Sequence, residues 1–111
     1  MRMWGVNPKK LCNQHLLGEH LEMHMFVGCI NKNICIDGYC KNKLVTPHLI
    51  RQRHDDLAEE MTLRGMKHQS PVANIFKTKL PEGNIDVDAN LKELISRCSK
   101  CKERIVNGLC E

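Results

Sequence analysis

Three segments of the chain carry apolar residues at helical spacing and predict three main helices. The first extends from Asn13 to about Ile30 and the second from Thr46-Pro47 to Gly65, where threonine acts as cap and proline lies in the first turn. The third begins at Asp86 or Asp88 and extends to Gly108. The apolar stripes of these three helices contain, in order, Leu16, Met23, Val27 and Ile30; Ile50, Leu57 and Met61; and Leu91, Leu94, Ile95, Cys98 and Ile105.

The connections between the three segments are long and polar. Residues 31–45 contain Asp37-Gly38-Tyr39 and are interpreted as a loop with short extended pieces, and residues 66–87 contain Pro71, Pro81 and Gly83. A cap-then-proline pair at Asn7-Pro8 predicts a short turn before the first helix. We therefore expect an all-α, compact single domain over residues 1–111, with three main helices and long irregular connections, and not an up-down bundle.

A second face of the first helix carries candidate chemistry. His15, Glu19, Glu22 and Phe26 recur at i, i+4, i+7 and i+11, which places the histidine and both carboxylates on one side. A large second residue such as Arg2 prevents removal of the initiator methionine, so we expect a free α-amine on Met1. An α-amine has a reference pKa of ~7.7–8.0, against ~10.4 for lysine, and is partly an uncharged nucleophile near neutral pH. An amine beside a helical carboxylate suits imine chemistry at a sugar carbon.

Composition narrows the class of protein without fixing it. The 111 residues are 41% hydrophobic but only 4% aromatic, so one domain must pack a core of Leu, Ile, Val, Met and Cys. The net charge of +4 suits an anionic partner, although ordinary solubility explains it equally well. The seven cysteines are an odd number, and neither a signal peptide nor an apolar run of the ~20 residues needed to span a bilayer is visible. We expect a reduced, cytoplasmic protein that does not enter a membrane.

Three blocks of residues resemble the phage pyrimidine-dimer DNA glycosylases, the family of the T-even phage endonuclease V. The first block extends from Met1 to Lys32, and the second from Pro47 to Gly65, preceded by Gly38-Tyr39. A weaker block includes Leu91, Glu93 and Ile95. The residues that carry the first two blocks are Arg2, Leu11, Gln14-His15-Leu16, Glu19, Glu22 and Gly28, and then Leu49-Ile50-Arg51 and Leu63-Arg64-Gly65.

The resemblance implies a DNA repair glycosylase with AP-lyase activity on pyrimidine dimers. The Met1 α-amine attacks the deoxyribose C1′, the base leaves, an imine forms, and β-elimination cuts the strand with the assistance of Glu22. In the T-even enzyme a threonine supplies the amine after the initiator methionine is removed, and Met1 stands at that place here. The expected substrate is damaged double-stranded DNA, with no cofactor and no obligatory protein partner; a phage origin would place the protein in the host cytoplasm.

Basic and polar residues supply the candidate DNA contacts. Leu21 and Met25 stand where the T-even enzyme has arginines beside the catalytic glutamate, which leaves the flanking histidines to contact phosphate. For His15 a structural hydrogen bond, and for Glu19 a structural ion pair, are the alternatives. Trp4 either lines the site or belongs to the core. The expected DNA-binding residues are Arg2, His15, Glu19, His20, His24, Arg51 and His68.

Three other functions fit part of the sequence. A nonenzymatic nucleic-acid-binding module could be stabilised by zinc at Cys98-x-x-Cys101 and Cys110, completed by Cys12, Cys35 or Cys40, but a single CxxC pair is more simply explained by buried thiols. We therefore expect no metal. The same imine chemistry could act on another modified or abasic base. A metal-dependent nuclease would use His15, Glu19 and Glu22 as ligands.

Overall fold

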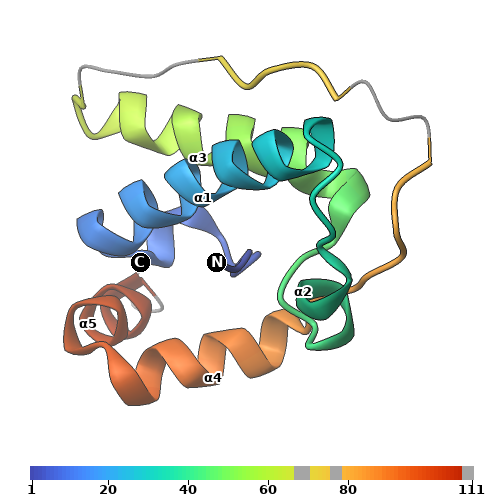
Figure 1. Ribbon diagram of the computed structural model, residues 1–111. Coiled ribbons are helices and arrows are strands. Elements are labelled where there is room, and N and C mark those ends of the chain that lie inside the picture. The colour runs from blue at the N-terminus through green and yellow to red at the C-terminus, as the bar shows by residue number, and fades with distance from the viewer. Residues whose placement is uncertain (67–70, 76–78, 109–111) are drawn as a thin grey trace.

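All regular structure in the described residues (1–66, 71–75 and 79–108 of the computed structural model) is helical (Figure 1). The expected all-α class is therefore confirmed. His68 and Cys110 lie outside the described residues. In chain order, the helices are η1 (Pro8–Lys10), α1 (Asn13–Asn31), α2 (Asp37–Lys41), η2 (Pro47–Leu49), α3 (Ile50–Leu63), α4 (Val87–Arg97) and α5 (Ser99–Gly108).

The first two main helices form where the apolar spacing predicted them. Asn7 caps the short turn η1 by accepting the Lys9 N–H, and Pro47 opens η2, from which α3 continues. The cap of α1 is Cys12, whose Sγ accepts the His15 N–H, and Asn13 is the first helical residue. Asp86 caps α4 through the Ala89 N–H.

Two sequence predictions of secondary structure are wrong. The segment interpreted as a loop contains the five-residue helix α2, and the single helix expected up to Gly108 is broken at Cys98. The backbone of Cys98 is extended, with φ −131° and ψ 106°, so α5 takes a new direction and packs against η1. Figure 1 shows α4 and α5 meeting at this corner.

The N-terminal segment passes through the middle of the molecule. α1 and α3 pack side by side, α4 lies across from them, and the N-terminus lies between (Figure 1). The Met3 N–H donates to the Leu44 carbonyl at 2.6 Å, and the Asn90 side-chain amide donates to the Trp4 carbonyl at 2.8 Å. Met3 and Trp4 are both buried, which confirms Trp4 as a core residue. These bonds hold residues 3 and 4 in the interior and so restrict where the start of the chain can lie.

Candidate active site

The Glu22 carboxylate on α1 faces the start of the chain. The backbone N–H of Arg2 and the Met1 α-ammonium both lie near enough to stabilise its negative charge. Burial raises the pKa of Glu22; the Met1 ammonium and the Arg2 N–H act in the opposite direction, and burial prevails. The structure thus brings together the amine and the carboxylate that the sequence put forward as a catalytic pair.

Arg2 anchors the N-terminal segment to α4. Its Nη1 donates to Glu93 Oε2 at 2.5 Å and its Nη2 to Asn90 Oδ1 at 2.7 Å. Its guanidinium lies 3.7 Å from the centre of the Trp4 ring, in cation–π geometry. These contacts hold the residue next to Met1 in place and occupy the side chain that we expected to contact DNA.

Glu19 is a structural residue, which corrects the expected DNA contact. The residue is 1% exposed, and its two carboxylate oxygens accept from Arg53 Nε at 2.6 Å and Nη2 at 2.9 Å. This bidentate pair joins α1 to α3 inside the protein. The charge that sequence reasoning assigned to a binding surface is therefore neutralised in the interior, and Arg53 is its partner.

His15 lies beside Trp4 and faces the thiols of Cys12 and Cys101. The two rings meet edge to face, with centroids 5.7 Å apart. His15 Nδ1 lies 3.2 Å from Cys12 Sγ and 3.5 Å from Cys101 Sγ. Burial and the charge of Arg97 lower the pKa of His15 against an opposing effect of Glu19, so the neutral imidazole is favoured.

The expected histidine contacts on α1 lie at its interface with α3. The rings of His20 and His54 are 4.5 Å apart, and His24 Nε2 lies 3.1 Å from His54 Nε2. His20 is buried, so the structure does not fit its expected contact with phosphate. His24 is half-buried, so its contact with phosphate stays a prediction. Arg51 is exposed on α3 and donates to Asn74 Oδ1 at 3.0 Å, which leaves it a surface candidate for DNA.

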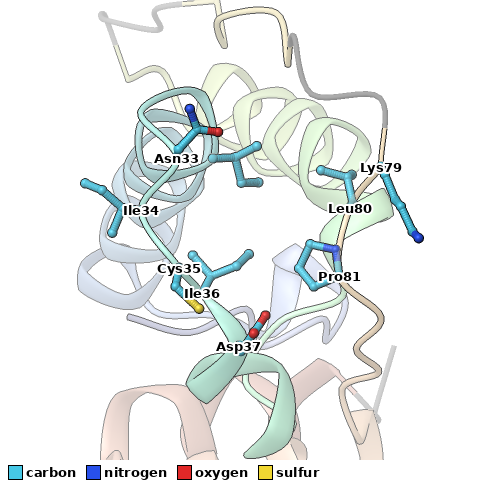
Figure 2. A pocket seen from close by; sticks show the side chains of 9 residues that line it. Asn33, Ile34, Cys35, Ile36, Asp37, Lys79, Leu80 and Pro81 are labelled. Atoms are coloured by element: carbon cyan, nitrogen blue, oxygen red, sulfur yellow. The ribbon is translucent and has the colours of Figure 1, made fainter.

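Among the described residues, two of the larger hollows are not lined by the Met1–Glu22 pair. One of about 410 Å³ opens between the end of α1, the start of α2 and Lys79-Leu80-Pro81 (Figure 2). Another, of about 350 Å³, lies between the N-terminal segment, α3 and residues 84–87. Neither hollow is lined by Met1 or Glu22, so their volumes do not help to locate the catalytic residues.

Sequence reasoning missed the residues that support the pair. Asn90 and Glu93 are three positions apart and therefore share a face of α4, which is a signal visible in the sequence. Arg53 gave no such signal, because its partner lies 34 positions earlier and the neighbouring residues are polar. Cys12 and His15 repeat the two-residue spacing of Cys98 and Cys101, which was a signal for a shared cluster.

In the part of the chain that the structure describes, no helix combines the length and apolar character needed to cross a bilayer. The model of the family "pyrimidine dimer DNA glycosylase" matches residues 1–74, a range that contains Met1, α1 and α3. Comparisons with curated proteins and with solved structures give no match. Because the family match covers well over half of the 111 residues, the chain belongs to the pyrimidine dimer DNA glycosylase family.

Proposed function

We propose that the protein excises a pyrimidine of a dimer from double-stranded DNA through an imine on the Met1 α-amine, and then cuts the strand as an AP lyase. The observation that carries this proposal is that the Met1 ammonium and the Arg2 N–H both stabilise the charge of Glu22, which supports a carboxylate close to the amine. Family membership supplies the substrate class.

The reaction begins with the unprotonated amine. Its nitrogen bonds to C1′ as the C1′–N bond to the pyrimidine breaks, and the base leaves with the electron pair and takes up a proton. Glu22 stabilises the positive charge that develops at C1′ and accepts a proton from the attached amine. Proton delivery to O4′ then opens the sugar and leaves an iminium between Met1 and C1′.

Strand cleavage follows from the same intermediate. Loss of a proton from C2′ and breakage of the C3′–O bond release a 5′-phosphate end, and water frees the amine by hydrolysis. A carboxylate whose pKa is raised by burial suits these steps, since it takes up a proton more readily than an ordinary glutamate and can return it. Access to C1′ in a duplex requires an extruded nucleotide, at a cost of a few kcal/mol.

The structure disfavours the nuclease alternative. That reading required His15, Glu19 and Glu22 to converge on one metal ion. Instead Glu19 is paired with Arg53 in the interior and His15 faces cysteines. The charge of Glu22 is instead stabilised by the Met1 ammonium and the Arg2 N–H, which supports imine chemistry.

Borohydride trapping tests the proposal. Duplexes with a cyclobutane dimer, an abasic site or no damage are incubated with the enzyme and reductant, and covalent adducts are expected on the first two only. Glu22→Gln should nearly abolish base release, whereas Glu59→Gln, an exposed glutamate on α3, should leave it unchanged. Normal base release by Glu22→Gln would exclude the assigned role of this carboxylate. An adduct on the abasic duplex alone would exclude dimers as the substrate.

A further inference from the structure

Four metal-ligating side chains converge where the start of α1 meets the corner between α4 and α5. Cys12 and His15 come from the first segment, and Cys98 and Cys101 from the second, more than eighty positions later. One ligand atom from each residue lies within 4.8 Å of all the others. From the sequence, a zinc site was considered at Cys98, Cys101 and Cys110, completed by Cys12, Cys35 or Cys40, but buried thiols with no metal were expected, and His15 was not considered as a ligand there.

The separations match those of a tetrahedral metal site. Bonds of ~2.3 Å from Zn²⁺ to sulfur and ~2.0–2.1 Å to nitrogen, at tetrahedral angles, put two sulfurs ~3.8 Å apart and a sulfur and a nitrogen ~3.6 Å apart. Cys12 Sγ and Cys98 Sγ are 3.9 Å apart, and His15 Nδ1 lies 3.2 Å and 3.5 Å from two of the thiols. A disulfide would need sulfurs at ~2.05 Å, so Cys12 and Cys98 are neighbouring free thiols and not a bonded pair.

The backbone around the cluster is arranged to stabilise thiolates. Cys12 N–H donates to Cys101 Sγ at 3.2 Å, His15 N–H to Cys12 Sγ at 3.4 Å, and Cys101 N–H to Cys98 Sγ at 3.4 Å. Such N–H donors to the sulfur atoms commonly support metal-bound cysteines. The sulfurs of Cys12, Cys98 and Cys101 thus each accept from a backbone N–H. Thiols that were buried only as small apolar side chains would not need these donors.

The fold also departs from its own periodicity at this point. The apolar repeat of the last helical region continues through Cys98, yet the helix breaks there and restarts at Ser99. The break brings Cys98 and Cys101 together onto Cys12 and His15. Burial as ordinary core thiols accounts for Cys12 and Cys101, which are 4% and 0% exposed, but not for the half-exposed Cys98 or for the imidazole among them.

We propose that Cys12, His15, Cys98 and Cys101 bind one structural Zn²⁺ ion. Protein ligands occupy all four positions, which is typical of structural sites and leaves no position for water or substrate. The ion ties the C-terminal helices to the N-terminal end of α1. His15 packs against the Trp4 ring, and the Arg2 guanidinium lies over that ring, so the ion also stabilises the N-terminal segment next to Met1.

The test is the zinc content of the full chain, purified under reducing conditions from zinc-supplemented cells and measured by elemental analysis. About one zinc per chain is expected. Cys98→Ser should remove most of it, while Cys35→Ser, an exposed thiol outside the cluster, should retain it. His15→Ala should lose zinc and His15→Cys should restore it, because a fourth thiolate replaces the imidazole.

A second measurement locates the ion even if a variant folds poorly. Wild-type protein reconstituted with Co²⁺ should show the intense visible bands of a tetrahedral thiolate site, and His24→Gln should not change them. Zinc that is retained by Cys98→Ser but lost by His24→Gln would place the metal in the cluster of His20, His24 and His54 and overturn the proposal. Metal-free wild-type protein with no tetrahedral Co²⁺ spectrum would overturn it as well.

Discussion

Removal of Glu19 alone should destabilise the fold far more than removal of Glu19 together with its partner. Glu19→Leu leaves the Arg53 guanidinium inside the protein, where it is 7% exposed, without the two hydrogen bonds at 2.6 and 2.9 Å that now neutralise it. An uncompensated buried charge of this kind costs ~3–5 kcal/mol. The double variant Glu19→Leu/Arg53→Met removes both charges at similar volume, and its free energy of unfolding should lie within ~1–2 kcal/mol of wild type.

Thermal unfolding followed by circular dichroism measures this difference. With an unfolding entropy of ~2.1 cal/mol/K per residue over 111 residues, the single variant should lose ~13–21 °C in Tm. Glu59→Leu, at an exposed position on α3, is the matched control and should change stability by at most ~0.5 kcal/mol. The double variant should also keep glycosylase activity, because Glu19 is buried and paired with Arg53 in the interior. A single variant as stable as the control, or a stable double variant without activity, would refute the structural role of Glu19.

Three further predictions concern the carboxylates of Glu22 and Glu60 and the side-chain amide of Asn90. Because burial raises the pKa of Glu22, its carboxyl carbon should titrate in 13C NMR above the pH at which an ordinary glutamate titrates, and a titration at the ordinary glutamate position would contradict this. Burial opposes ionisation of Glu60, but Arg64 and Lys9 outweigh burial and lower the pKa of Glu60. The ionised Glu60–Arg64 pair therefore stabilises the fold at pH values above the unfolded-state pKa, and this stabilisation is lost as the pH falls through the lower folded-state pKa. Arg64→Ala should weaken this dependence of the free energy of unfolding on acid pH, measured by urea unfolding. Asn90→Ala removes the hydrogen bond to the Trp4 carbonyl and should cost ~1–3 kcal/mol of stability. It should also lower kcat more than it raises KM, whereas Lys92→Ala, at an exposed position on the same helix, should change neither. Equal effects of the two variants on kcat would exclude a positioning role for Asn90.

Local spacing predicted the parts of the fold that depend on local sequence. The stripe from Leu16 to Ile30 and the capping residues at Asn7 and Asp86 are visible in the sequence because each acts within a few residues. The five-residue helix α2 is too short for periodicity to identify. The break at Cys98 interrupts a continuous apolar repeat and coincides with contacts to residues more than eighty positions away, so no local pattern indicates it.

The candidate site divides in the same way. The spacing of Glu22 on its helix and the resemblance of residues 1–32 were enough to put Met1 and this carboxylate forward together. The partner of Glu19 was not predictable, since a helical face that carries charge can be solvated or can bury an ion pair, and only the packing of α3 decides between them. The four ligands of the proposed zinc site were visible as two spaced pairs, but their meeting depends on the tertiary fold.

The most direct measurement of the central claim is the location of the covalent bond. The enzyme is reduced with borohydride on an abasic duplex and digested, and the peptide that carries the sugar remnant is sequenced by mass spectrometry. The remnant should be on the α-nitrogen of Met1, and prior acetylation of that nitrogen should prevent its attachment. A remnant on the side chain of Lys9 or Lys10, or full trapping by the acetylated protein, would contradict the account.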